Sequence, residues 1–368
     1  MKGLLVHEWI AKNGGSENVF ARLADIYPDA DLLCLWNDAP HRFDPARTRE
    51  TWLAGSPLRG RKAAALPLMP ATWRNRKESA DWMLVSSHLF AHQITLSSGP
   101  VPKFVYVHTP ARYIWAPDLD LRGASLPARA IGALFKPIDR KRATSATSIA
   151  ANSEFIAGRI REAWHRDATV IYPPVETSRI QAITDWADEL TAEEAAQLEA
   201  LPPQYVLGAS RFVSYKRLDL VIAAGEAADV PVVLAGTGPD EDSLRARAAE
   251  ARVPVHFVHR PSDALLYALY QRALVFVFPP IEDFGIMPVE AMATGTPVIV
   301  NSIGGARESV AAPVAGTFFE SEDASELRRA VEVAAAVDRS AVAARAREFS
   351  AERFDEEIRS WVDEHVGS

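Results

Sequence analysis

Short runs of apolar residues alternate along the chain with segments of helical periodicity. The predicted strands of the first half cover residues 2–6, 32–35, 82–86, 104–107, 148–151 and 169–172. Those of the second half cover residues 205–207, 232–235, 255–258, 274–278 and 298–300. Strands that are apolar on both faces and alternate with helices are typical of a parallel sheet covered on both sides. Two such series predict an α/β protein with two doubly wound, Rossmann-like domains.

Helical patterns fill the intervals and indicate where the domains divide. They cover residues 16–25, 154–164, 218–228, 242–251 and 263–271. An acidic helix is expected over residues 182–200, because Pro202 and Pro203 would stop it. We therefore place the two domains at residues 1–175 and 176–350. Residues 351–368, with Phe354 and Trp361 among charged residues, predict an amphipathic terminal helix.

The loops that follow the strands are the candidate sites, because parallel α/β sheets bind ligands beyond the carboxyl ends of their strands. Gly14 and Gly15 follow the first strand and precede a helix. Glycines let a ligand approach the backbone closely, and the free N–H groups at a helix start suit a diphosphate. The same pair also fits a simple turn before a helix.

Two cations follow the first strand of the second half. Arg211 could bind two phosphate oxygens in fork geometry, and Lys216 would add a point charge. They could converge on one diphosphate, although a solvated basic loop would carry the same residues. Gly236 and Gly238 form another tight turn at a strand end, without the GxGxxG spacing of a dinucleotide dehydrogenase.

A pair of carboxylates follows the predicted strand at residues 274–278. Pro288 suits the first turn of a helix and Gly295 its end, which places Glu282 in the loop and Glu290 in the first turn. Carboxylates accept hydrogen bonds from hydroxyl groups, so a sugar and a ribose are natural ligands. The helix start between them can hold a diphosphate. A capped helix with an acidic first turn would explain Glu290 but not the whole cluster.

The first half has a polar and aromatic loop after the predicted strand at residues 104–107. His108 could hydrogen-bond to a sugar, and Tyr113 and Trp115 could stack on one. A structural role explains a single histidine equally well. His88 follows two serines, but no GxSxG nucleophile elbow surrounds them. We interpret His88 as structural or acceptor-facing.

The charge is distributed unevenly along the 368 residues, which carry a formal net charge of −8. Residues 1–175 have 23 Lys and Arg against 16 Asp and Glu, whereas residues 176–368 have 17 against 32. Such asymmetry suggests that the halves face different partners. The basic half could meet an anionic membrane or acceptor, or it could simply be solvated. Its basic clusters lie at residues 59–62, 73–77 and 140–142.

Composition and short motifs also limit which metal and cofactor sites the sequence can form. With 48% hydrophobic and 24% charged residues, the chain resembles ordinary globular proteins. Its single cysteine, Cys34, lies between leucines and predicts a buried strand thiol. The pairs Asp29-x-Asp31 and Asp118-x-Asp120 match a metal-binding DxD by spacing alone, and we interpret both as surface loops. With no P-loop, HExxH or paired CxxC pattern, neither a metal nor a cofactor is expected.

These features together resemble the retaining glycosyltransferases of family 4, which have the GT-B fold. The most specific part is the spacing Glu282-x7-Glu290 within the segment EDFGIMPVEAMATGTPVI. The N-terminal Gly-Gly loop, Arg211 followed by Lys216, and the Gly236-x-Gly238-Pro turn are also similar. The segment YVHTPARYIW resembles bacterial mannosyltransferases that build surface polysaccharides. One departure is Arg217, where the family often has glycine.

The resemblance implies a role for each of these residues. Arg211 and Lys216 would hold the donor diphosphate, Glu282 the transferred sugar and Glu290 the ribose. The backbone of Phe284, Gly285, Ile286 and Met287 would bind phosphate and sugar, His108 would lie beside the sugar, and Gly14 and Gly15 would close on the diphosphate. Arg112, Tyr113 and Trp115 are the candidates for acceptor contacts.

The resemblance also implies two facing domains with the active site in the cleft between them, and a terminal helix that crosses back towards the first domain. The enzyme would be a hexosyltransferase that uses a nucleoside-diphosphate sugar, GDP-mannose for preference, on a saccharide or lipid-linked acceptor. Another GT-B enzyme, such as a nucleotide-sugar epimerase or a phosphorylase, or a non-catalytic sugar-nucleotide-binding subunit, is the alternative. No nucleic-acid partner is expected. The expected location is cytoplasmic, with peripheral contact to the inner face of a membrane.

Overall fold

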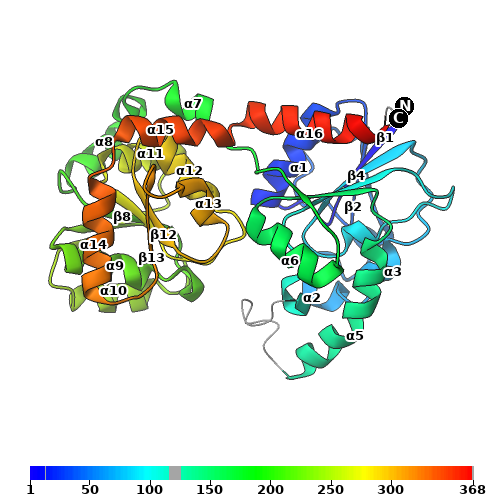
Figure 1. Ribbon diagram of the computed structural model, residues 1–368, viewed down its shortest axis with the longest axis horizontal. Coiled ribbons are helices and arrows are strands. Elements are labelled where there is room, and N and C mark those ends of the chain that lie inside the picture. The colour runs from blue at the N-terminus through cyan, green and yellow to red at the C-terminus, as the bar shows by residue number, and fades with distance from the viewer. Residues whose placement is uncertain (13, 116–125, 367–368) are drawn as a thin grey trace. The chain divides into compact units, whose positions relative to one another are not determined.

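The computed structural model describes residues 1–12, 14–115 and 126–366, and the chain divides into two compact units. Unit 1 comprises residues 1–174 and 354–368, and unit 2 comprises residues 175–353. Each unit is built around one sheet in which every pairing between neighbouring strands is parallel (Figure 1). The α/β class predicted from the apolar runs is therefore confirmed.

Unit 1 has a seven-stranded sheet in the order β3-β2-β1-β4-β5-β6-β7. Its strands are β1 (Gly3–His7), β2 (Asp31–Cys34), β3 (Thr48–Glu50), β4 (Trp82–Ser87), β5 (Lys103–Val107), β6 (Ser148–Ala151) and β7 (Thr169–Val170). Its helices are α1 (Gly15–Ile26), α2 (Lys62–Ala65), α3 (Met69–Thr72), α4 (Arg112–Trp115), α5 (Leu126–Ala143), α6 (Glu154–Trp164) and most of α16 (Ala351–Val366). The edge strand β3 is short and polar, and the hydrophobic pattern did not predict it.

Alternate residues of the central strand β1 serve two different cores. Leu4 and Val6 pack into the apolar cluster on one face of the sheet, and Leu5 packs into the cluster on the other. This arrangement is the physical reason that the strands read as apolar on both faces. Cys34 is fully buried within the second cluster, as predicted.

The terminal helix α16 covers part of the same second face of unit 1. Its apolar residues Phe354, Ile358, Trp361 and Val362 belong to that cluster. The Trp361 indole N–H donates to Ser148 Oγ at 2.8 Å, and Arg22 on α1 makes a paired contact with Asp355. In Figure 1, α16 and α1 lie side by side at the ends of the colour scale. The helix begins in unit 2 and carries the chain back into unit 1.

Unit 2 has a six-stranded sheet in the order β10-β9-β8-β11-β12-β13. Its strands are β8 (Val206–Arg211), β9 (Val232–Thr237), β10 (Val255–His259), β11 (Val275–Phe278), β12 (Val298–Asn301) and β13 (Gly316–Phe319). Its longer helices are α8 (Ala192–Glu199), α9 (Leu218–Ala228), α10 (Glu241–Ala249), α11 (Asp263–Arg272), α12 (Ile286–Ala293), α14 (Ala324–Ala335) and α15 (Arg339–Ala346). Two shorter helices, α7 (Thr177–Gln181) and α13 (Ala306–Val310), complete it.

Helix starts and stops follow the local sequence signals. The Ser153 hydroxyl accepts a hydrogen bond from the Ile156 N–H at 3.1 Å and caps α6. The single helix predicted over residues 182–200 is wrong. The chain forms a short 3₁₀ turn at Trp186–Glu189 and then α8, because Thr191 and Glu194 form a capping box that begins a new helix. That S/T-x-x-E pattern was present in the sequence.

Candidate functional site

The strand order of unit 2 reverses between β8 and β11. From β8 the chain proceeds outwards through β9 and β10, and from β11 it proceeds the other way through β12 and β13. Such a reversal separates the loops at the carboxyl edge of the sheet and leaves room for a ligand. Arg211 is the last residue of β8, and the loop with Glu282 follows β11. The predicted donor residues thus lie at this point of the fold.

Lys216 and Glu282 are joined directly, although 66 residues separate them in the sequence. Lys216 Nζ lies 2.5 Å from Glu282 Oε1, and both side chains are largely buried. The Lys216 ammonium also lies 5.5 Å from the centre of the Phe278 ring, at the end of β11. The more exposed Arg211 donates to the Tyr215 hydroxyl at 2.8 Å. Lys216 and Glu282 therefore form an ion pair in the absence of a ligand.

Gly236 and Gly238 have a packing role that the sequence did not reveal. A Cβ atom on Gly236 would lie 1.9 Å from the Ser210 carbonyl oxygen, and one on Gly238 would lie 2.2 Å from the Phe212 carbonyl oxygen. Gly236 also has φ of 142°, which an L side chain rarely adopts. Gly236 therefore lets the end of β9 pack closely against the end of β8, and Gly238 does the same for the residues that follow each strand. A direct contact with the donor stays a prediction for both.

The loop after β11 leads into the start of α12. Gly285 has φ of 93° and ends the loop, and α12 begins at Ile286 with no side-chain cap from the described residues. The Gly305 N–H donates to the Glu282 carbonyl oxygen at 2.8 Å, so the loops after β11 and β12 support each other. The Phe284 side chain is buried and packs near Phe349, which leaves only its backbone for a ligand. Ile286 and Met287 are half-buried at the helix start.

Glu290 lies one turn further along α12 than predicted. The helix begins at Ile286, two residues before Pro288, so Glu290 is its fifth residue and not part of the first turn. Burial, and then the neighbouring Asp263, raise the pKa of Glu290 to about 7, and Arg179 opposes them. The tyrosines at 267 and 270 of α11 also face this carboxyl group. Glu290 therefore titrates near neutral pH, unlike an ordinary glutamate.

Unit 1 has the same reversal of strand order, between β1 and β4, and three polar side chains meet there. His7 ends β1, Ser86 belongs to β4, and His108 follows β5. The Ser86 hydroxyl lies 2.8 Å from His108 Nε2 and 3.1 Å from His7 Nδ1. Burial, and then the neighbouring histidines, hold the pKa of His108 well below its usual value. His108 is thus a neutral imidazole held by a hydroxyl.

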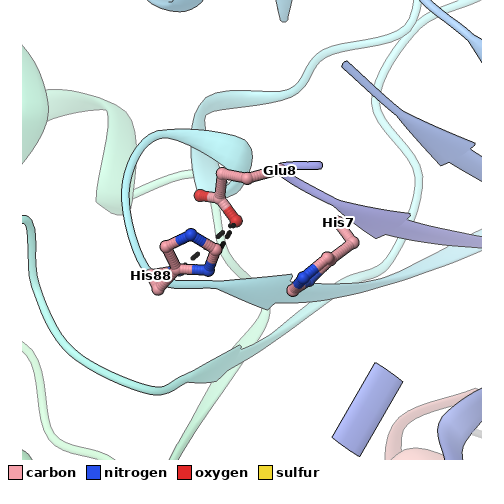
Figure 2. Close-up of side chains that lie close together, drawn as sticks. All are labelled: His7, Glu8 and His88. Carbon is pink, nitrogen blue, oxygen red and sulfur yellow. Dashed lines mark hydrogen bonds and ion pairs between the residues drawn. The ribbon is translucent and has the colours of Figure 1, made fainter. Parts of the chain in front are cut away.

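A second group at this edge was not among the predicted site residues. Glu8 is fully buried, and its Oε1 accepts hydrogen bonds from the N–H groups of Leu89 and Ala91 at 2.8 and 2.9 Å. Its Oε2 faces the His88 ring, with His88 Nδ1 at 3.5 Å (Figure 2). In Figure 2, dashed lines join Glu8 to His88, and His7 lies to the right of both. Sequence reasoning missed this group because His7 ends β1 and His88 follows β4, and the hydrophobic pattern does not reveal that these two strands are adjacent.

The Gly14–Gly15 loop is occupied by a side chain of its own helix. Gly15 is the first residue of α1, one residue before the predicted start of the helix. The Glu17 carboxylate lies beside Gly14, where a Cβ atom would come within 2.0 Å of its Oε2. Glu17 is buried and also accepts from the Ser16 hydroxyl at 2.8 Å. A diphosphate contact at these glycines stays a prediction, and the adjacent carboxylate would oppose it.

The three predicted acceptor residues share α4 but have different surroundings. The Trp115 indole N–H donates to Asp139 Oδ2 at 2.8 Å, so this ring is held in the fold of unit 1. Tyr113 lines a cavity of about 310 Å³ together with Trp9, His88 and Phe135. Arg112 is half-buried at the start of α4. Tyr113 therefore shares a cavity with His88, which lies at the carboxyl ends of β1 and β4.

The basic clusters of unit 1 are partly used within the fold. Arg59 pairs with Asp38 and Glu50, Arg76 pairs with Glu78, and Arg142 donates to the Pro70 carbonyl oxygen. Arg61, Arg74, Lys77 and Lys141 are exposed. No helix in the part of the chain that the structure describes is long and apolar enough to cross a membrane.

The two DxD pairs have different standing. In the first pair, Asp29 lies in an exposed turn, as predicted, whereas Asp31 begins β2 and pairs with Lys2 at 2.9 Å. Asp118 and Asp120 of the second pair lie outside the described residues.

Known proteins resemble parts of this sequence. Residues 191–348, which include all the candidate residues of unit 2, match the family Glycosyl transferases group 1. D-rhamnosyltransferase WbpZ of Pseudomonas aeruginosa is 36% identical over 110 residues, which is 29% of each chain. Phosphatidyl-myo-inositol mannosyltransferase of Mycolicibacterium smegmatis is 33% identical over 105 residues, 28% of this chain and 27% of the relative. The chain thus spans less than a third of the length of these relatives.

Known structures resemble the whole chain. HepE of Anabaena, solved in complex with UDP, superposes with a TM-score of 0.71 and 18% sequence identity over 99% of this chain and 100% of HepE. Sucrose-phosphate synthase of Thermosynechococcus elongatus gives a TM-score of 0.70 and 18% identity over 99% of both chains. At this identity the likeness establishes the fold alone. The predicted GT-B fold is confirmed.

Proposed function

We propose that this protein is a glycosyltransferase that takes a sugar from a nucleoside-diphosphate donor. The observation that carries the proposal is the meeting of Lys216, Glu282 and the start of α12 where the strand order of unit 2 reverses. Cations and an uncapped helix start attract a diphosphate, and carboxylates accept hydrogen bonds from sugar hydroxyls. The family match over the same residues supports this function.

Each residue of this group has a separate role in the proposal. Arg211 and Lys216 hold the diphosphate, and the backbone from Phe284 to Met287 completes the anion site. Glu282 orients the transferred sugar, and Glu290 accepts hydrogen bonds from the ribose. When the diphosphate arrives, it competes with Glu282 for Lys216, which frees the carboxylate for the sugar hydroxyls.

The transfer step needs no protein nucleophile. We propose that the acceptor hydroxyl attacks the anomeric carbon from the side on which the nucleoside diphosphate leaves, so that the anomeric configuration is retained. The departing phosphate takes the acceptor proton. The protein supplies positive charge and fixed geometry, with His108 beside the sugar. Because two side-chain cations and a helix start can neutralise the leaving group, the donor diphosphate requires no divalent metal.

The donor and the acceptor are proposed by class. GDP-mannose is our first choice of donor, because the matched relatives include several with mannosyltransferase names. HepE has been solved with UDP-glucose, so UDP-sugars are the competing class. We propose a saccharide or a lipid-linked saccharide as the acceptor and a cytoplasmic location.

A thermal-shift panel of nucleoside diphosphates and their sugars tests the proposed function. A ligand that binds only the folded state stabilises it by about 2.7 kcal/mol at a hundred times its Kd. We expect GDP and GDP-mannose to raise the unfolding temperature more than UDP, UDP-glucose or the nucleosides, with EDTA present or absent. No shift with any nucleotide would contradict the donor site. Donor turnover without an acceptor would indicate an epimerase or phosphorylase, and binding without turnover across many acceptors a non-catalytic subunit.

A separate prediction concerns attachment to a membrane, where lipid-linked acceptors would be found. The exposed cations of the basic clusters and the exposed Leu68 should give weak attachment to anionic vesicles, with about 1 kcal/mol from each cation near the surface. Sedimentation with vesicles of anionic and neutral lipid, at low and high salt, measures it. Binding that high salt abolishes is the expected result. Equal sedimentation with both lipids, or none at low salt, would contradict it and leave the transferase proposal intact.

A further inference from the structure

Three side chains at the β1–β4 edge of unit 1 can each offer a metal ligand atom. The ligand atoms of His7, Glu8 and His88 lie within 4.8 Å of one another (Figure 2). His7 and Glu8 are fully buried, and the side chain of His88 is 19% exposed. Two imidazoles and one carboxylate are a ligand set that divalent transition metals take in proteins.

Two nitrogens of this group have no hydrogen-bond partner among the described residues. They are His7 Nε2 and His88 Nδ1, and both are buried. A buried polar atom without a partner costs free energy, so each such atom in a native fold calls for an explanation. His88 Nδ1 does lie 3.5 Å from Glu8 Oε2, a contact too long for a good hydrogen bond. Coordination of one ion would satisfy both nitrogens.

The other atoms of His7 and Glu8 are held as metal ligands usually are. His7 Nδ1 lies 3.1 Å from the Ser86 carbonyl oxygen, which can only accept, so Nδ1 carries the proton and Nε2 presents a lone pair. Glu8 Oε1 is fixed by the N–H groups of Leu89 and Ala91. Its Oε2 accepts a long hydrogen bond of 3.3 Å from the His88 N–H and also faces the His88 ring. These bonds orient both ligands before an ion binds.

The surrounding charge favours a cation. The buried carboxylates of Glu8 and Glu17 both act on His7. The nearby cation Lys62 instead lies 4.1 Å from the centre of the Trp9 ring. Ligand atoms about 2.1 Å from one tetrahedral ion lie about 3.4 Å apart, so binding would shorten the longest separation, which is within 4.8 Å, by up to about 1.4 Å.

We propose that His7, Glu8 and His88 form a binding site for a divalent transition metal ion, with Zn²⁺ as the best match. Three protein ligands leave the fourth position of a tetrahedral ion open. His88 also lines the cavity with Trp9 and Tyr113, which gives water or a ligand a route to that position. Because His7 and His108 share the Ser86 hydroxyl, the ion would fix the ends of β1, β4 and β5. The site is independent of the proposed donor site in unit 2.

The test uses the full chain after chelation and dialysis, with Zn²⁺ followed by calorimetry and elemental analysis and Co²⁺ by its visible absorption. The ligand variants are Glu8→Gln and His88→Gln, which keep a hydrogen-bonding side chain of similar size. The exposed His41→Gln in the same unit is the matched control. We expect about one Zn²⁺ per wild-type chain and per H41Q chain, and a loss of at least about tenfold in affinity in E8Q and H88Q.

The outcomes separate the possibilities. Zn²⁺ should also raise the unfolding temperature of the wild type and of H41Q, but not of the two ligand variants. Absence of stoichiometric binding by the wild type, or equal binding by all four proteins, would overturn the proposal. Binding of nucleoside diphosphate serves as the folding control for the variants. Because the proposed diphosphate ligands Arg211 and Lys216 lie in unit 2, it should survive removal of zinc, so the two proposals can fail separately.

Discussion

Replacing Arg211 or Lys216 with alanine should weaken binding of the donor nucleotide by roughly tenfold or more in each variant. A hydrogen bond to a charged group contributes about 1.5–3 kcal/mol, and a diphosphate offers each cation at least one such bond. Arg211 is the more exposed of the two, and its guanidinium donates to the Tyr215 hydroxyl. Lys216 must be shared with Glu282. Titration calorimetry with the nucleoside diphosphate measures both losses.

The control for this experiment is Arg329→Ala on α14, an exposed arginine of the same unit. Loss of its charge should leave binding unchanged, which separates local contacts from the general charge of unit 2. In Lys216→Ala the Glu282 carboxylate loses its ion pair with the lysine and would repel the diphosphate. The double variant Lys216→Ala with Glu282→Gln should therefore bind better than Lys216→Ala alone. Wild-type affinity in both single variants would refute the assignment.

The second large effect is a division of labour between the two carboxylates. Glu282→Gln should lower the rate of transfer by about tenfold to a hundredfold, because the sugar loses a charged hydrogen bond that orients its reacting carbon. The same change releases Lys216 from its ion pair, so binding of the free nucleoside diphosphate should be unchanged or tighter. Glu290→Gln should weaken binding of the free nucleoside diphosphate as well, because its proposed partner is the ribose.

Glu290 adds a pH signature to this comparison. Burial raises its pKa to about 7 in the folded protein, above the unfolded value of about 4.5. The folded state then holds a proton that the unfolded state has lost, so the contribution of Glu290 to stability falls as pH rises from about 4.5 to 7. Ribose hydroxyls that donate to the carboxylate would lower this pKa. Nucleotide binding should therefore release a proton near pH 7, and the affinity should increase as the pH rises from about 6 to 8.

Calorimetry in two buffers of different ionisation enthalpy measures the released proton, and Glu290→Gln should abolish this release. The neighbouring groups Asp263 and Arg179 remain in that variant, so a proton release that persists would come from a group other than Glu290. Equal loss of free nucleotide binding in Glu282→Gln and Glu290→Gln would contradict the division of labour. Intact thermal unfolding of both variants is the control for folding.

Local sequence signals determined the elements of the fold. The apolar runs predicted most strands, the helical pattern over residues 154–164 predicted α6, and the predicted terminal helix begins at Ala351 as α16 does. These features depend on residues within one or two turns of each other, so they can be recognised without a partner. The short polar strand β3 escaped because hydrogen bonds at a sheet edge define it, not burial. The break before α8 was overlooked, although Thr191 and Glu194 carry its signal.

The same reasoning placed the candidate residues in loops after strands, but only the tertiary structure decided which loops meet. The strand order puts β8 beside β11 and so joins Lys216 to Glu282. It also puts β1 beside β4 and so brings His7 and Glu8 to His88 across some 80 residues of sequence. The glycines at the end of β9 allow this strand to pack closely against the end of β8. Hydrophobic periodicity records which face of a strand is buried, and it carries no information about which strand lies next to it.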